Sequence, residues 1–174
     1  LNLQIPDYYR MIEMKTAALF GAATELGARL SGKPESVQEA MKSYGLKLGT
    51  AYQIYDDCLD LVGDEKAVGK TLRTDLIKGK LTLPILFLLM DATDAQRRKL
   101  SQILLQGEPM DTSLLAGIAD YEGAIERAVK SAKDLLEEAR AELICLDGSD
   151  QKQALEDITR YLDSLLDDCR VLAA

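Results

Sequence analysis

The chain has 174 residues, with 21 lysine and arginine residues against 29 aspartate and glutamate residues, so its net charge is −8. This acidic balance argues against general nucleic-acid binding and against electrostatic attachment to anionic lipid. The chain contains no histidine, which excludes Ser-His-Asp triads, Cys-His pairs and zinc sites with histidine ligands.

Composition and patterning predict an all-α fold in one domain or part of one. Residues that favour helices dominate, and no stretch alternates apolar and polar residues as a half-buried strand would. We expect helices over residues 6–30, 35–63, 83–91, 94–106, 111–143 with a break about Asp120, and 149–171. The longest apolar run, residues 83–90, is too short to span a membrane, and no cationic, apolar leader opens the chain, so we expect a cytoplasmic protein.

The first predicted helix carries a lysine within its apolar face. The apolar positions at helical spacing are Tyr8, Met11, Ile12, Leu19, Ala22, Ala23, Leu26 and Leu30. Lys15 falls inside this stripe, where a lysine must extend to water, pair with an acid or hold an anion. Thr16 becomes a candidate site residue through its place beside Lys15.

The second predicted helix has an acidic stripe on an otherwise apolar surface. At about 100° per residue, one narrow side carries Gln53, Asp56, Asp57, Asp60 and Asp64. Like charges at this spacing repel one another, and apolar neighbours strengthen the repulsion, so a cation is expected there. Gly45 and Gly49 point to the same side, which indicates close approach of either a ligand or another helix.

Lysines that could meet this stripe follow in a connection punctuated by glycines. Its segments are Gly69-Lys70-Thr71, Asp75, Gly79-Lys80 and the helix start Thr82-Leu83-Pro84. A Walker loop is excluded because Asp64 stands where its first glycine is required, and an EF-hand because Leu61 stands at its glycine position. The acidic stripe and the lysines together indicate a site where divalent cations bridge the carboxylates to a diphosphate.

The order of these motifs resembles the C-terminal half of a trans-isoprenyl (polyprenyl) diphosphate synthase. The matching residues are Lys15-Thr16, Gln53, Asp56-Asp57, Asp60, Gly69-Lys70, Asp75 and Gly79-Lys80 with Thr82-Leu83-Pro84. The chain departs from the family pattern at Tyr52, where phenylalanine is common, and at Arg73, where glycine is frequent. Neither departure removes a proposed ligand.

The resemblance implies an isoprenoid-synthase helical bundle, with residues 1–174 as the C-terminal portion of one polyprenyl synthase domain. It implies a homodimer that condenses an allylic diphosphate with isopentenyl diphosphate. The implied catalytic residues are Lys15, Thr16, Gln53, Asp56, Asp57 and Asp60. The implied diphosphate contacts are Lys15, Thr16, Gln53, Lys70 and Lys80, and the implied Mg2+ ligands are Asp56, Asp57 and Asp60.

The family's other aspartate-rich motif is missing from this sequence. Residues 1–48 contain no adjacent aspartates, and the pair Asp167-Asp168 is followed by no third aspartate at the required spacing. We therefore expect this chain to be a fragment that is inactive alone. The alternative is a non-catalytic helical subunit or dimerisation module that retains the motif. A third hypothesis, a terpene cyclase, is disfavoured because residues 56–64 do not match the second motif that is usual in that class.

Overall fold

The computed structural model describes residues 3–63, 65, 69, 71–106 and 112–173. By the density of its internal contacts the chain divides into two compact units. The first unit comprises residues 1–8, 54–130 and 167–174, and the second comprises residues 9–53 and 131–166.

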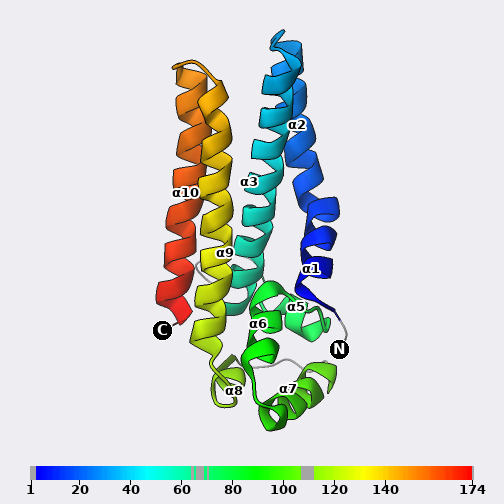
Figure 1. Ribbon diagram of the computed structural model, residues 1–174. Helices are drawn as coiled ribbons and strands as arrows, with labels where there is room; N and C mark the ends of the chain where they lie inside the picture. Colours follow the sequence, from blue (N-terminus) through cyan, green and yellow to red (C-terminus); the bar gives the residue numbers. More distant parts are fainter. Residues whose placement is uncertain (1–2, 64, 66–68, 70, 107–111, 174) are drawn as a thin grey trace. The chain divides into compact units, whose positions relative to one another are not determined.

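Every regular element in the described residues is a helix, which confirms the predicted all-α class. Figure 1 labels the α-helices α1 (Ile5–Ile12), α2 (Ala18–Leu30), α3 (Glu35–Val62), α5 (Thr74–Ile77), α6 (Leu83–Asp91), α7 (Asp94–Gln106), α8 (Thr112–Ala116), α9 (Tyr121–Glu142) and α10 (Asp150–Ala173). A π-helix, η1 (Glu13–Ala17), and a 3-10 helix, η2 (Leu143–Cys145), complete the set. The break expected about Asp120 lies between α8 and α9.

The first predicted helix is not continuous, because η1 separates α1 from α2. The amide of Ala18 reaches back five residues to the carbonyl of Glu13, which is the bonding pattern of a π turn. Single π turns of this kind are frequent at functional sites. Here the turn contains Lys15 and Thr16, the two site candidates of this segment.

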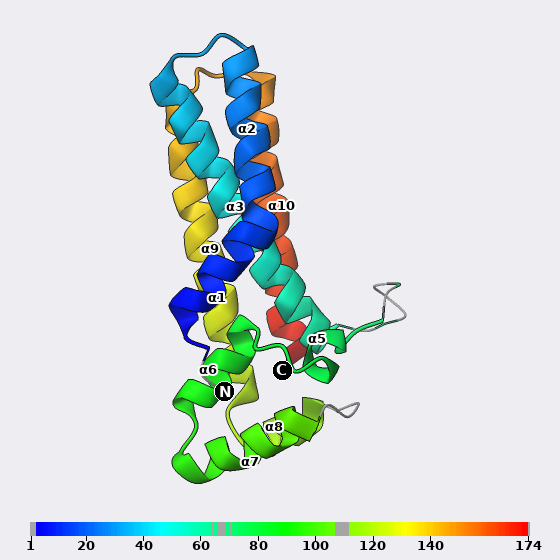
Figure 2. The ribbon, with the colours of Figure 1, turned by 90° about the vertical axis from the view of Figure 1, so that its right-hand side faces the viewer.

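In the second unit, the long helices α2, α3, α9 and α10 run alongside one another (Figures 1 and 2). The hydroxyl of Tyr44 on α3 donates to the carbonyl of Leu155 on α10 at 2.8 Å. Lys47 donates to Glu142 of α9 at 2.7 Å, and this contact lowers the pKa of the Glu142 carboxyl. Helix α3 is thus tied to both C-terminal helices of this unit.

Helix α3 closely approaches the end of η1 and the start of α2 at two glycines. A Cβ atom on Gly49 would lie 2.7 Å from the Cα of Ala17, and one on Gly45 would lie 2.4 Å from the carbonyl oxygen of Phe20. The hydroxyl of Thr24 crosses the same contact and donates to the carbonyl of Met41 at 2.6 Å. Of the two reasons considered for these glycines, the structure supports the approach of a helix.

The first unit contains the shorter helices, and α6 is its most apolar element. Residues 83–88 of α6 are all buried. The helix begins as predicted, with Thr82 in extended conformation and Pro84 in the first turn. None of the helices among the described residues combines the length and apolar character needed to cross a membrane.

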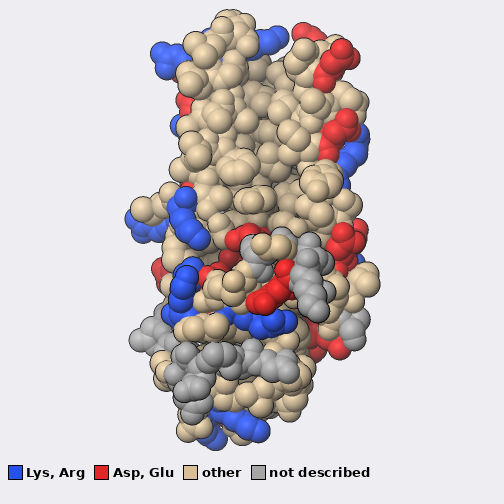
Figure 3. Space-filling view, turned by 180° about the vertical axis from the view of Figure 1, so that it is seen from behind, with Lys and Arg blue, Asp and Glu red and all other residues tan. Residues whose placement is uncertain are grey.

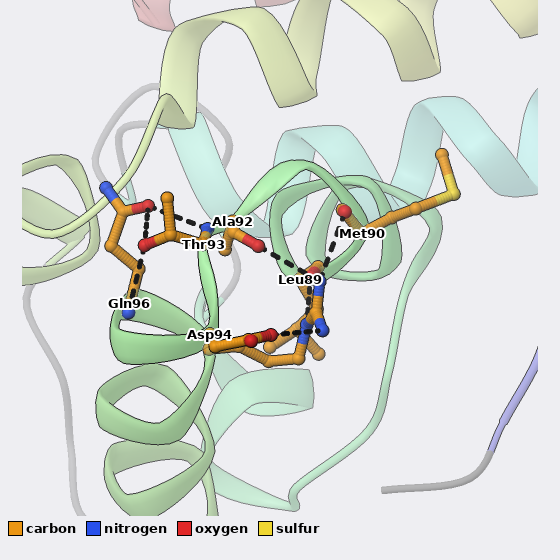
Figure 4. Close-up of polar contacts among 7 residues, drawn as sticks. Leu89, Met90, Ala92, Thr93, Asp94 and Gln96 are labelled. Atoms are coloured by element: carbon orange, nitrogen blue, oxygen red, sulfur yellow. Dashed lines mark hydrogen bonds and ion pairs between the residues drawn. The ribbon is translucent and has the colours of Figure 1, made fainter.

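The corner between α6 and α7 is fixed by side chains that satisfy helix ends (Figure 4). The backbone amide of Thr93 donates to Oε1 of Gln96 at 2.9 Å, and the backbone amide of Gln96 faces the Thr93 hydroxyl at 3.4 Å. The two contacts form a capping box. Arg97 donates to the carbonyls of Leu89 at 2.9 Å and Ala92 at 3.0 Å. The guanidinium therefore satisfies carbonyls that the end of α6 leaves open.

Candidate functional site

Three members of the acidic stripe, Asp56, Asp57 and Asp60, lie in the last turns of α3, in the first unit. Asp57 and Asp60 are buried, with 4% and 6% of their surface exposed, whereas Asp56 is half-buried. Ile54, Cys58 and Leu61 surround them with apolar core. Buried carboxylates require hydrogen-bond donors or cations, so the partners of Asp57 and Asp60 define the local chemistry.

Asp57 is held by a tyrosine from the start of the chain. The hydroxyl of Tyr8, on α1, donates to Oδ2 of Asp57 at 2.6 Å, and both side chains are buried. This short distance is typical of a hydroxyl that donates to a charged carboxylate. The apolar spacing places Tyr8 on the buried face of its helix and does not predict this hydrogen bond.

Asp60 is held by the segment that begins α5. Its Oδ2 accepts from the amide of Asp75 at 3.2 Å, and its backbone carbonyl accepts from the amide of Arg73 at 2.9 Å. Oδ1 also faces the amide and the hydroxyl of Thr74, each at 3.4 Å. The carboxylate therefore fixes the loop that leads toward Lys80.

This loop requires a backbone conformation that favours glycine. Arg73 has φ 58° and is the one non-glycine residue with positive φ among the residues that the structure describes. The left-handed conformation costs an L-residue about 1–2 kcal/mol. The departure from glycine noted in the sequence therefore has a conformational cost.

Replacing Arg73 by glycine is expected to raise the free energy of unfolding by about 0.5–1 kcal/mol, because relief of the strained φ outweighs the greater freedom of glycine in the unfolded chain. Urea unfolding followed by circular dichroism measures the change. Lys78→Gly is the matched control: Lys78 is exposed in the same segment with φ −80°, so glycine should destabilise there. A loss of stability in both variants would contradict the strain at Arg73.

Lys80 is one of the predicted diphosphate contacts, and Asp75 connects it to Asp60 of the stripe. Its Nζ lies 2.5 Å from Oδ1 of Asp75. This hydrogen bond raises the pKa of Lys80; burial opposes the rise, and the charges of Asp75, Asp57 and Asp60 add to it. Gly79 allows the approach, because its φ of 65° lets the Lys80 amide return to the Asp75 carbonyl at 2.9 Å. Figure 3 shows a face of the chain on which basic and acidic side chains lie side by side.

In the second unit, the structure joins two further candidates. The hydroxyl of Thr16, in η1, donates to Oε1 of Gln53 on α3 at 2.6 Å. Lys15 is exposed, as are Leu19, which is 75% exposed, and Leu30, which is 80% exposed. The apolar stripe around Lys15 is therefore mostly open to solvent rather than part of the core of this unit.

Two predictions lie partly outside this geometry. Lys70 and Asp64 fall outside the described residues. In the described ranges, no group of three or more acidic or cysteine side chains comes together closely enough to hold a metal ion. The assignment of Asp56, Asp57 and Asp60 as joint metal ligands stays a prediction.

Comparison with known proteins decides the family. The family model described as polyprenyl synthetase matches residues 1–121. The chain belongs to the polyprenyl synthetase family. The matched range includes every site residue predicted from the sequence, from Lys15 to Lys80.

Individual polyprenyl synthetases agree in sequence and fold. A short chain isoprenyl diphosphate synthase of Methanothermobacter thermautotrophicus is 36% identical over 93% of this chain and 50% of its own length. An octaprenyl diphosphate synthase of Haemophilus influenzae is 34% identical over 86% of this chain and 46% of its own. The crystal structure of a decaprenyl diphosphate synthase from Rhodobacter capsulatus superposes with a TM-score of 0.79 at 32% identity, over 92% of this chain and 50% of that one. The chain thus spans about half the length of these relatives.

Proposed function

We propose that a protein containing this chain is a Mg2+-dependent prenyltransferase that condenses an allylic diphosphate with isopentenyl diphosphate. The allylic C–O bond breaks, pyrophosphate leaves, the isopentenyl double bond attacks the resulting cation, and loss of a proton gives a longer allylic diphosphate. The observation that carries this proposal is that the carboxylates of Asp57 and Asp60 on α3 act electrostatically on Lys80, in a chain of the polyprenyl synthetase family.

The donor chemistry of α3 fits Mg2+. This ion prefers oxygen ligands and is commonly bound by one or two carboxylates together with water and substrate phosphates, so it needs no preformed cluster of three. Asp56 is half-buried and can reach an ion, and Asp57 and Asp60 would complete its surroundings. Bound Mg2+ supplies positive charge that stabilises the departing pyrophosphate.

The lysines and the polar pair of the second unit have distinct proposed roles. Lys80 exchanges its ion pair with Asp75 for a diphosphate oxygen, because a diphosphate carries more negative charge than a single carboxylate. Lys15, Thr16, Gln53 and Lys70 are proposed to contact diphosphate as well. The Thr16 hydroxyl donates to Oε1 of Gln53 and so fixes the orientation of the Gln53 side-chain amide. A homodimer and a cytoplasmic location belong to the same proposal.

The proposal is tested with a hybrid protein, in which this chain is joined to the half of the Methanothermobacter relative that it does not match. With Mg2+, radiolabelled isopentenyl diphosphate and a range of allylic primers, the hybrid is expected to form elongated products. The 174-residue chain alone is expected to form none, because its sequence supplies one of the two aspartate-rich motifs that the family resemblance requires.

Two controls make the result specific. The unmodified relative sets the reference activity, and the hybrid without Mg2+ sets the background. A folded hybrid without activity, whose circular dichroism and melting match those of the relative, would support the non-catalytic module instead. Product formation by the isolated chain would contradict the half-site argument.

A further inference from the structure

The contact between Tyr8 and Asp57 links two segments that lie 49 residues apart. The phenol of Tyr8 is 0% exposed and Asp57 is 4% exposed, so water has little access to either group. Both residues belong to the first unit. A buried ring keeps its hydroxyl in one place, and the carboxylate oxygen that accepts from it is held with it.

We propose that Tyr8 is a positioning residue of the acidic stripe. Its hydroxyl fixes the Asp57 carboxylate in the orientation from which the stripe receives a Mg2+-diphosphate complex. This inference rests on the proposed function. The physical basis is preorganisation, because hydrogen bonds behind metal-binding groups fix their direction before the ion arrives.

Asp57 receives its hydrogen bond from Tyr8 through a side chain rather than through the backbone. Asp60 already accepts from backbone amides of the 73–75 segment, which the covalent chain holds in place. Tyr8 instead reaches Asp57 through a side chain from α1, so a single atom, the phenolic oxygen, can be removed without altering the backbone. Tyr8→Phe therefore separates the orientation of Asp57 from its presence.

A second buried tyrosine provides the matched control. Tyr44 is also 0% exposed, and its hydroxyl donates to the Leu155 carbonyl at 2.8 Å in the second unit. Tyr44→Phe removes a part-buried hydrogen bond of similar length with no carboxylate at its end. Both phenylalanine variants should lower stability, and Tyr8→Phe should lower it more because its partner is a carboxylate, whereas only Tyr8→Phe should affect ion and diphosphate binding.

The first measurement is calorimetric titration of inorganic pyrophosphate, at fixed Mg2+, into the 174-residue chain and its variants. We expect Tyr8→Phe to weaken binding about tenfold and Tyr44→Phe to change it less than about twofold. Because Tyr8 acts through Asp57, adding Tyr8→Phe to Asp57→Asn should cause no further loss of affinity. An unchanged affinity in Tyr8→Phe, or an equal loss in the Asp57→Asn background, would overturn the proposal.

The second measurement keeps the hydroxyl and so does not depend on whether Tyr8→Phe folds. 3-Fluorotyrosine placed at position 8, and in a separate sample at position 44, reports through its 19F resonance. Mg2+ with pyrophosphate should shift the resonance at position 8 and leave that at position 44 in place. A position 8 resonance that does not respond at saturation would overturn the proposal.

The two proposals fail in different ways. If the unmodified chain shows no Mg2+-dependent pyrophosphate binding and the hybrid forms no product, the proposed function is wrong and this inference falls with it. If Asp57→Asn weakens binding while Tyr8→Phe does not, the function stands and Tyr8 is a structural residue alone.

Discussion

Asp56→Asn is expected to reduce kcat/KM of the hybrid protein by about two to four orders of magnitude, because the change removes the charge of a proposed Mg2+ ligand and substitutes an almost isosteric amide. Asp56 is half-buried and asparagine has nearly the same size and shape, so the fold should be retained. Steady-state kinetics over a range of Mg2+ concentrations measure the effect. Circular dichroism should show unchanged helix content.

Asp157→Asn is the matched control for this loss. Asp157 is exposed on α10, where it accepts from Arg160 at 2.8 Å, and its removal takes one carboxylate from another helix. Activity should stay within about twofold, as expected for an exposed ion pair. Near-normal activity of Asp56→Asn, or an equal loss in Asp157→Asn, would show that the stripe is not a metal site.

Gly45→Ala is expected to lower the free energy of unfolding by about 2 kcal/mol, although alanine is the better helix former by about 1 kcal/mol. The new Cβ would lie 2.3 Å from Oγ1 of Thr24 and 2.4 Å from the carbonyl oxygen of Phe20, so α2 and α3 must separate. Chemical unfolding of the chain measures the loss.

Gly27→Ala provides the opposite expectation within α2. A Cβ at this position meets no atom within 4 Å, so only helix propensity changes, and stability should rise by up to about 1 kcal/mol. The contrast between the two glycines isolates the close approach. If both variants gain stability, the contact between α2 and α3 is looser than described.

Local sequence features predicted most of the helices. The boundaries of α3, α6 and α7 were predicted to within one residue, because their starts carry proline or polar residues and their interiors carry helical periodicity. Helix α5 was not predicted. It has four residues, and its first turn depends on the Asp60 carboxylate, which lies 14 residues earlier in the sequence. A contact between residues this far apart in the sequence cannot be predicted from the pattern of neighbouring residues.

The candidate site likewise contains residues that the sequence could indicate and one residue that it could not. Asp57, Asp60 and Lys80 could be proposed from spacing and charge, and the structure links them electrostatically. Tyr8 could not, since its partner is 49 residues away and a tyrosine in an apolar face is normally core. For the glycines of α3, the sequence left a ligand and a helix as alternatives, and only packing against α2 distinguishes them.

The π turn at residues 13–17 amounts to a one-residue insertion within a helix. Such an insertion rotates everything that follows by about 100°, so side chains that would continue one face of α1 come to lie on another face of α2. Ile12 is 2% exposed, whereas Leu26 is 53% exposed. Deleting a single residue here would therefore rotate α2 by about 100° and turn a different set of its side chains toward α3.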